Sequence, residues 1–277
     1  MTTAHVNEEF VEVTQIRSWA EIWRNCHDSR WLLWMLEWVS CSEPKLRLFA
    51  CWCARQSWRI VGHVIYEDMV EMAELYSLGE AGREQMATLW ENRRGGAAGA
   101  GVCGMPKCRP GAAAQLASFQ TCRDDARDAA WQAAIYAARA AGFEAAEEEA
   151  ERVSWKRNCD EKWQESYRTV SFIANNPSIA EEAEDIARAE QADGLRQIVG
   201  NPMLRGNTEV PVPAQTLAYW MTWGFVPEKG QGGVWHFTSD LVGARVSFNT
   251  MMEEYSPSGV VVCTSRATGK IPHQKKH

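Results

Sequence analysis

Up to about residue 200, apolar residues recur with the period of a helix. Residues 8–40 fit one or two amphipathic helices, with an aromatic face at the i, i+3, i+4, i+7 spacing. That face consists of Trp31, Trp34, Met35 and Trp38. A further helix is expected to begin at Pro44, because proline is well tolerated in the first turn of a helix. The apolar stripe of this second helix is Leu46, Phe49, Ala50, Cys53, Ser57, Ile60 and Val64.

Three later segments continue the helical pattern. Residues 66–79 carry an apolar face and end at a glycine, as helices often do. Residues 112–150 are rich in alanine, and their small side chains favour close packing of neighbouring helices. The third helix is expected over 177–199, because Ser178 and Glu181 have the spacing of a capping box and Gly200 follows.

A glycine-rich stretch, 94–111, separates two groups of these helices. Glycine at this density loses too much backbone entropy to be stable inside a helix, so a flexible loop is expected there. The loop would divide a tryptophan-rich helical region, 1–93, from an alanine-rich helical region, 112–205, that packs on the first. Helices joined by short connections pack as antiparallel neighbours, which predicts a bundle-like body.

After residue 206 the pattern changes to short apolar runs punctuated by glycine and proline. A short helix is expected over 214–223. Three runs rich in β-branched and aromatic residues are typical of strands, namely 234–238, 244–248 and 260–264. The sequence therefore predicts a mainly α protein with a small C-terminal α+β or β-hairpin region, 206–277.

Composition and charge narrow the class of protein. The 277 residues are 45% hydrophobic and 23% charged, which is typical of a globular chain. The net charge of −7 disfavours nucleic acid as a partner, because binding phosphate generally requires a basic field. No apolar run approaches the length of a membrane span and no secretory leader is visible, so we expect a cytoplasmic protein without membrane contact.

The segment Lys45-Leu46-Arg47-Leu48-Phe49-Ala50-Cys51-Trp52-Cys53-Ala54-Arg55-Gln56-Ser57-Trp58 carries a family resemblance. It is similar to the K-L-R-L-F-A-C-x-C-x-R-x-x-W-like helix of an uncharacterised helical protein family of planctomycete-type bacteria. A second motif of that family resembles Gly200-Asn201-Pro202 with the residues before it. The resemblance spans about 28–205 and implies a helical fold in a bacterial cytoplasm. It implies no known activity and no catalytic residues.

The nine cysteines suggest reduced thiols, and two pairs invite comparison with metal sites. Cys51 and Cys53 lie two apart on a helix and point to opposite faces, which favours one buried and one half-buried thiol. Cys103 and Cys108 lie in the glycine-rich stretch and have a spacing that zinc sites allow. A zinc site there would need two further ligands from Cys122, Cys159, His63 or His27. No cofactor is therefore expected, with zinc as the alternative.

Chemistry in the C-terminal region centres on His236. This histidine, with Arg245, Arg266 and Lys270, could gather on one face of a small sheet and act on RNA by acid–base catalysis and phosphate binding. A structural role for a histidine beside Trp235 is the competing interpretation.

The sequence favours a non-enzymatic interaction or adaptor protein, because no convergent polar constellation accompanies its abundant tryptophan. Tryptophan is a common anchor at protein interfaces. Besides Arg245 and Arg266, the expected contact residues are Trp220, Trp223 and Trp235, unless these rings fill the terminal core. The alternatives are an RNA-contacting or ribonuclease-like C-terminal module regulated by the helical body, and a zinc-stabilised scaffold.

Overall fold

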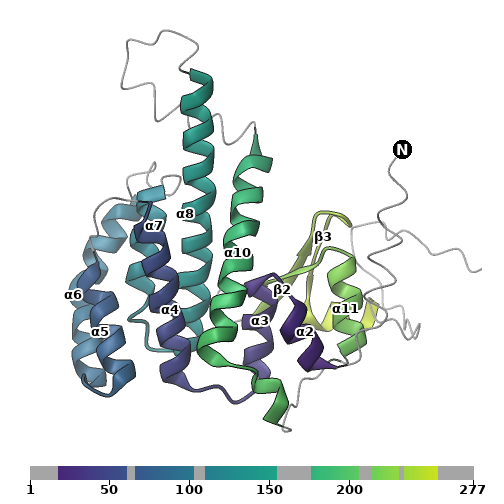
Figure 1. Ribbon diagram of the computed structural model, residues 1–277, viewed down its shortest axis with the longest axis horizontal. Coiled ribbons are helices and arrows are strands. Elements are labelled where there is room, and N and C mark those ends of the chain that lie inside the picture. The colour runs from purple at the N-terminus through teal and green to yellow at the C-terminus, as the bar shows by residue number, and fades with distance from the viewer. Residues whose placement is uncertain are drawn as a thin grey trace, which may run out of the picture. The chain divides into compact units, whose positions relative to one another are not determined.

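The fold is mainly α with a small three-stranded antiparallel sheet, as the sequence predicts (Figure 1). The computed structural model describes residues 18–60, 66–102, 110–154, 176–205, 212, 214–230 and 234–254. The chain forms two compact units. The helical unit is His27–Pro202, and the composite unit combines Met1–Cys26 with Met203–His277.

The helical unit is an array of packed helices joined by loops. Its elements are α3 (Ser29–Met35), the 3-10 turn η1 (Leu36–Trp38), α4 (Glu43–Trp58), α5 (Glu67–Leu78), α6 (Arg83–Val102), α7 (Pro110–Gln120), α8 (Ala126–Ser154) and α10 (Pro177–Val199). A further 3-10 turn, η3 (Pro202–Arg205), follows. The helix expected from Pro44 is α4, and the helix expected over 66–79 is α5, which ends at Gly79 in the left-handed conformation.

Helix α4 is the centre of the helical unit. It packs against α5, α7, α8 and α10, so side chains around most of its circumference are buried (Figure 1). Cys51 and Cys53 are both buried for this reason. The expectation of one half-buried thiol is wrong, because opposite faces of a central helix both meet neighbouring helices.

Two glycines, which have no side chain, allow the helices to approach closely. A Cβ atom on Gly142 of α8 would lie 2.8 Å from the backbone oxygen of Ala180 in α10. A Cβ atom on Gly194 of α10 would lie 2.7 Å from the ring of Trp52 in α4. Both contacts are too short for a methyl group, so glycine sets the spacing of α10 from its two neighbours.

The predicted loop over 94–111 is wrong in its first half, because α6 continues as a helix to Val102. Two contacts hold α6 in place just before the glycines: Trp90 stacks on Phe119 of α7 at 4.1 Å, and Arg93 pairs with Asp68 of α5 at 2.6 Å. Extending an established helix needs no new nucleus, and each glycine costs only about 1 kcal/mol relative to alanine. Residues 103–109 lie outside the described part of the chain.

The predicted capping box at the start of α10 is also wrong. The N-cap residue is Asn176, without a side-chain cap hydrogen bond, and Ser178 already lies inside the first turn. Proline is favoured at the first helical position because its fixed φ angle suits a helix, and here Pro177 occupies that position. The predicted extent of this helix, to Val199, is correct.

The composite unit joins segments from both ends of the sequence. Its elements are α2 (Trp19–Asn25), α11 (Ala214–Thr222), β1 (Val226–Lys229), β2 (Trp235–Ser239), β3 (Ala244–Ser247) and α12 (Phe248–Glu254). Helix α2 contacts α11, and α12 contacts β2 and β3. The predicted regions, 1–93 and 206–277, place α2 and α11 apart, whereas the structure places both helices in one unit. The helical periodicity of α2 contains no information about a packing partner as distant in the sequence as α11.

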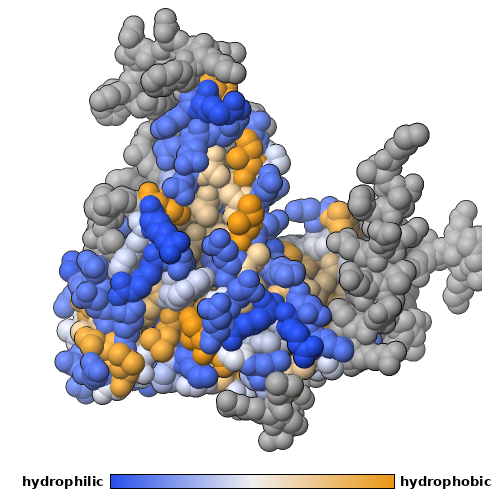
Figure 2. Space-filling view, viewed as in Figure 1, coloured by the Kyte–Doolittle hydropathy of each residue, from blue (hydrophilic) through white to orange (hydrophobic). Residues whose placement is uncertain are grey.

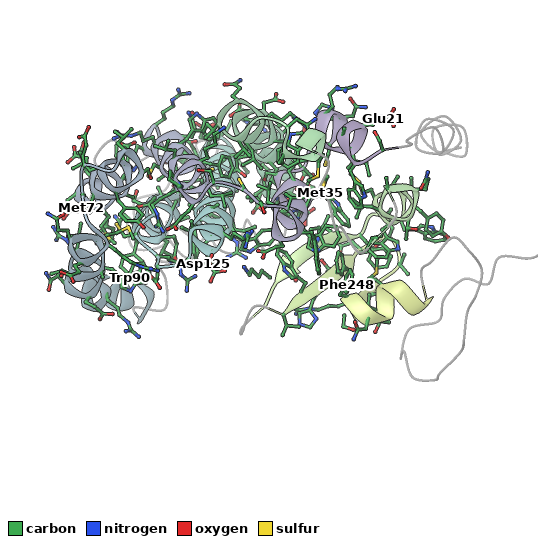
Figure 3. All side chains as sticks on the ribbon, turned by 90° about the horizontal axis from the view of Figure 1, so that it is seen from below. Glu21, Met35, Met72, Trp90, Asp125 and Phe248 are labelled. Atoms are coloured by element: carbon green, nitrogen blue, oxygen red, sulfur yellow. The ribbon has the colours of Figure 1, made fainter. Side chains whose placement is uncertain are left out.

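The sheet has the order β1-β2-β3, and both pairs are antiparallel. Strands β2 and β3 confirm two of the three predicted runs, and 260–264 lies outside the described residues. Strand β1 was not expected, because Pro227 argues against a strand; β1 is an edge strand, where proline is tolerated. On one face of the sheet Phe237 packs against Trp220 and Phe248, and Figure 3 shows Phe248 where the sheet meets α12.

Candidate functional site

The composite unit presents a polar sheet face opposite its aromatic core. In the β-sheet register His236 lies between Glu228 and Ser247, and Thr238 lies opposite Arg245. Side chains at paired positions point to the same side of a sheet and alternate along each strand. His236 therefore shares a face with Glu228 and Arg245, while buried Phe237 points to the other side. This placement agrees with the predicted gathering of His236 and Arg245.

Two contacts define the geometry of that polar face. The Nη2 atom of Arg245 lies 3.6 Å from Oε2 of Glu228, and both side chains are about half exposed or more. A Cβ atom on Gly230 would lie 3.2 Å from Cδ2 of His236, so the imidazole rests over a glycine that leaves space for it. A carboxylate, an imidazole and a guanidinium are thus grouped on one open surface.

The three tryptophans expected to contact a partner have different surroundings. Trp220 has no exposed surface and lies in the aromatic core, so it has nothing to offer a partner. Trp223 and Trp235 are each half-buried; Trp223 packs edge-on against Tyr219, and Trp235 lies 5.7 Å from the ammonium group of Lys229. Arg266 and Lys270 lie outside the described residues.

Three of the described cysteines, Cys51, Cys53 and Cys122, are buried and structural. The thiol of Cys51 donates to the carbonyl of Val70 at 3.7 Å, and that of Cys122 donates to the carbonyl of Met69 at 3.0 Å. Burial raises the pKa of both Cys51 and Cys53, and it raises the pKa of Cys122 to about 12. A thiol that stays protonated near neutral pH is a poor nucleophile and a poor metal ligand.

The metal prediction concerns residues that the structure does not describe. Cys103 and Cys108 lie outside the described ranges, as do Cys159 and His63. Within those ranges, no three His, Cys, Asp or Glu side chains are grouped closely enough to hold a metal ion. Over the same residues, no helix combines the length and the apolar character needed to cross a membrane.

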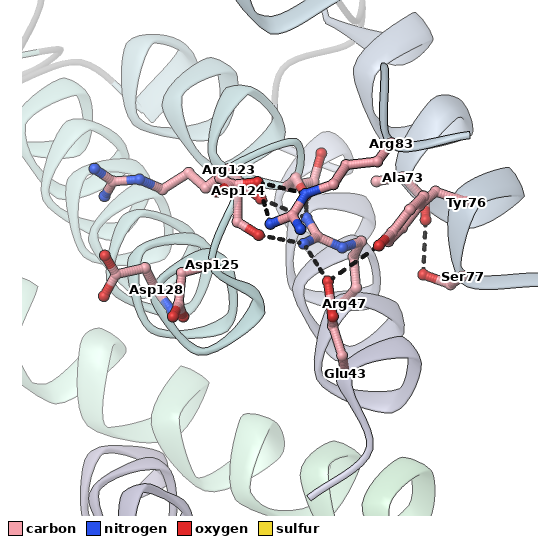
Figure 4. A network of polar contacts seen from close by, with 11 residues as sticks. Glu43, Arg47, Ala73, Tyr76, Ser77, Arg83, Arg123, Asp124, Asp125 and Asp128 are labelled. Carbon is pink, nitrogen blue, oxygen red and sulfur yellow. Dashed lines mark hydrogen bonds and ion pairs between the residues drawn. The ribbon is translucent and has the colours of Figure 1, made fainter. Parts of the chain in front are cut away.

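Arg47 organises the junction of α4, α7 and α8 and is fully buried (Figure 4). Its Nη1 atom donates to the carbonyls of Thr121 and Arg123 at 2.8 and 2.7 Å, and Nη2 donates to the carbonyl of Asp124 at 3.1 Å. Glu43 accepts a further bond from Nη2 at 3.2 Å. Because three of these acceptors are backbone carbonyls between α7 and α8, Arg47 clamps the turn that joins those two helices.

The helical unit has a groove between α4, α8 and α10, with a volume of about 190 Å³. We use "the groove" for the site lined by Trp52, Gln56, Ser57, Arg59, Ile60, Ala137, Ala141, Glu144, Ala187, Glu190 and Gln191. Figure 2 shows pale, apolar surface along α8 with hydrophilic surface to either side. The site thus combines an apolar interior with charged edges.

A buried hydrogen-bond chain fixes one wall of the groove. The Oε1 atom of Gln191 accepts a bond from the hydroxyl of Ser29 at 2.9 Å, and Nε2 donates to the carbonyl of Ala134 at 2.9 Å. This single amide therefore links α3, α8 and α10. On the opposite wall, Trp52 stacks on Phe49 within α4. The groove is preformed, because both walls are held by contacts of the protein with itself.

Carboxylates dominate the charge of the groove. Glu144 and Glu190 line it, with Arg59 as the one cation among its lining residues. Partial burial raises the pKa of Glu144, and the neighbouring carboxylates of Glu148 and Glu147 raise it further. The lining residues therefore carry two carboxylates against one guanidinium, an excess of one acidic group.

Comparison with known proteins identifies no relative. No family model matches the chain, and no match was found among the curated proteins or the solved structures. The resemblance to helical proteins of planctomycete-type bacteria therefore stays a prediction.

The groove was not predicted from the sequence. Trp52 lies inside the motif at 45–58, but Glu144 belongs to a charge run that is typical of a solvated helix face. One signal was available in retrospect: Gly194 is a small residue inside a helix, where glycine is unfavourable unless something packs closely against it.

Proposed function

We propose that this protein is a non-enzymatic interaction or adaptor protein of a bacterial cytoplasm and that its helical unit docks a protein partner in the groove. The observation that carries the proposal is the groove itself, which is open, preformed and partly apolar. Preformed walls favour binding, because little side-chain freedom is lost when the partner docks. An aromatic ring beside such a site is a common anchor for a partner.

Filling the groove tests this function. Ala141 and Ala187 line it from α8 and α10, so Ala141→Leu/Ala187→Leu adds apolar volume inside it. Ala87→Leu adds a similar side chain at an exposed position of α6 and is the matched control. Tagged full-length proteins are used to capture partners from the native host, and the captured proteins are quantified by mass spectrometry.

The expected result is a stoichiometric protein that the wild type and Ala87→Leu retain and the filled variant loses. Circular dichroism establishes that the filled variant keeps its helix content. Equal capture by all three proteins would show that the groove does not dock the partner.

An RNA-contacting role for the composite unit is the second candidate. It is favoured by the grouping of Glu228, His236 and Arg245 on one sheet face, which offers a base, an acid and a cation for a phosphodiester. His236→Ala should abolish cleavage of RNA while leaving the fold intact, and Arg245→Gln should weaken RNA binding. Undiminished cleavage by His236→Ala would remove the role proposed for the imidazole.

A further inference from the structure

The apolar part of the groove has the shape needed for an alkyl chain. Ile60 and the methyl groups of Ala137, Ala141 and Ala187 line it, together with the half-buried ring of Trp52. A volume of about 190 Å³ accommodates one extended side chain and is too small for a helix or strand. The groove is therefore suited to a single projecting side chain of a partner.

The charges around the groove decide which side chain fits. Three other carboxylates of α10 form ion pairs: Arg188 pairs with both Glu184 and Asp185, and Arg196 pairs with Asp193. Glu144 and Glu190 form no ion pair with any residue of the described ranges. Two carboxylates that lack an ion-pair partner among the described residues, at the edge of a partly apolar site, are complementary to a cation on an alkyl stem.

We propose that the groove binds a lysine or arginine side chain of the partner protein, with its alkyl stem against Trp52 and its cationic head between Glu144 and Glu190. This inference rests on the proposed docking function and adds the chemistry of the contact. Long basic side chains commonly bury an apolar stem and keep the charged head near the surface. An anionic partner group would meet both carboxylates and would be repelled.

Arg59 adds specificity to this arrangement. It is exposed at the end of α4 and lines the same groove. A guanidinium there repels a second cation, so the groove accepts one basic side chain and not a run of them. The partner segment is expected to carry an isolated lysine or arginine among uncharged residues.

At a pH where Glu144 is partly protonated, binding of a cation should release protons. The groups that act on Glu144 are Glu147 and Glu148 on its own helix, with Glu190 and Arg59 lining the groove from α10 and α4. The pKa of Glu144 is raised in the free protein, and a bound ammonium group would lower it. Affinity for the cation should therefore increase as pH rises through the pKa of Glu144.

The test uses full-length protein and three small probes. These are N-acetyl-lysine amide, N-acetyl-arginine amide and N-acetyl-norleucine amide, and the last has an alkyl stem without a charge. Binding is followed by NMR through the indole N–H of Trp52, assigned with Trp52→Phe. We expect saturable shifts with the two cationic amides and a response at least about tenfold weaker with the norleucine amide, equivalent to about 1.4 kcal/mol.

Charge variants complete the design. Glu144→Gln/Glu190→Gln removes two carboxylates from the groove, and Glu181→Gln/Glu182→Gln removes two exposed carboxylates from the start of α10. The first variant should bind N-acetyl-lysine amide about tenfold more weakly, and the second should bind it like the wild type. Equal affinity of the first variant, an equal response to the norleucine amide, or no shift with any probe would overturn the inference.

The two proposals fail in distinguishable ways. If Ala141→Leu/Ala187→Leu loses the captured partner while Glu144→Gln/Glu190→Gln retains it, docking in the groove stands and the cationic contact is refuted. If the filled variant retains the partner, the docking function itself is refuted.

Discussion

Replacing Arg47 should destabilise the helical unit more than any other single change to its polar contacts. The guanidinium is fully buried and donates to three backbone carbonyls and one carboxylate. It also lies 5.2 Å from the ring of Tyr76. In Arg47→Ala the carbonyls of Thr121, Arg123 and Asp124 lose their charged donor, and the removed stem leaves a cavity at the junction.

The magnitude follows from these contacts. A hydrogen bond to a charged group contributes about 1.5–3 kcal/mol, and three such bonds would sum to well above 4 kcal/mol. Desolvation of the guanidinium offsets a large part of that sum, since burying an ion costs several kcal/mol. Breaking a buried charged interaction by removing one partner typically costs about 3–5 kcal/mol, and we expect Arg47→Ala to fall in that range.

Arg47→Lys separates charge from geometry. Lysine keeps the positive charge but lacks the planar fork that serves several carbonyls at once. It should recover part of the loss, leaving about 1–3 kcal/mol of destabilisation. Arg83→Met is the matched control, because Arg83 also reaches this turn through Asp124 but is largely exposed, and its removal should change stability little.

The assay is urea unfolding at equilibrium, followed by circular dichroism at a helical wavelength. Slopes of the free energy against urea must agree between variants before midpoints are compared. A loss of less than about 1 kcal/mol for Arg47→Ala, or equal losses for Arg47→Ala and Arg83→Met, would refute the reasoning that the buried guanidinium clamps the turn.

Three further predictions follow from close packing and burial. Gly194→Ala should cost about 1–3 kcal/mol in urea unfolding, because its Cβ would lie 2.7 Å from the ring of Trp52. Cys51 and Cys122 should resist a thiol reagent at pH 8 in the folded protein and react fully in urea. Since burial raises the folded pKa of Cys122 from 9.0 to about 12, its contribution to stability should be complete below pH 9 and should be lost as pH rises towards 12. Trp220→Ala should lower the free energy of unfolding of the composite unit by about 3–5 kcal/mol. It should also weaken the near-ultraviolet circular dichroism, because Trp220 lies in the aromatic core of that unit.

Each of these predictions has an internal comparison. Gly82→Ala should be tolerated, because the nearest atom to its added Cβ is 3.6 Å away. Cys41 is only partly buried and should react with the thiol reagent before Cys51 does. Trp235→Ala should cost less than Trp220→Ala, since Trp235 is half-buried. A reversal of any of these orders would contradict the packing described above.

The sequence predicted local structure well wherever periodicity alone determined it. The helices from Pro44 and Pro177, the glycine that ends α5 and two of the strands were all found from apolar spacing and terminal signals. The glycine-rich end of α6 was missed, because packing of Trp90 and pairing of Arg93 outweigh the propensity of the residues that follow.

Features that depend on distant partners could not be predicted. Arg47 looked like one of several basic residues in a motif, and its importance comes from carbonyls more than seventy positions away. The sheet face was found in part, since His236 and Arg245 were expected to gather, but Glu228 was not, because it belongs to a strand that contains a proline. Burial of Trp220 follows from three elements meeting, which a linear pattern does not encode.

The composite unit has a consequence for the order in which the protein forms during translation. Helix α2 leaves the ribosome before every other element of the described residues, yet the helix that it contacts, α11, begins only at Ala214. At about 5–20 residues per second, that interval lasts roughly ten to forty seconds. The described helices from α3 to α10 emerge in the meantime. Ile22 and Trp23 are buried in the folded protein, but during this interval α2 lacks its contact with α11. A nascent chain halted before α11 should therefore be the species most dependent on chaperones.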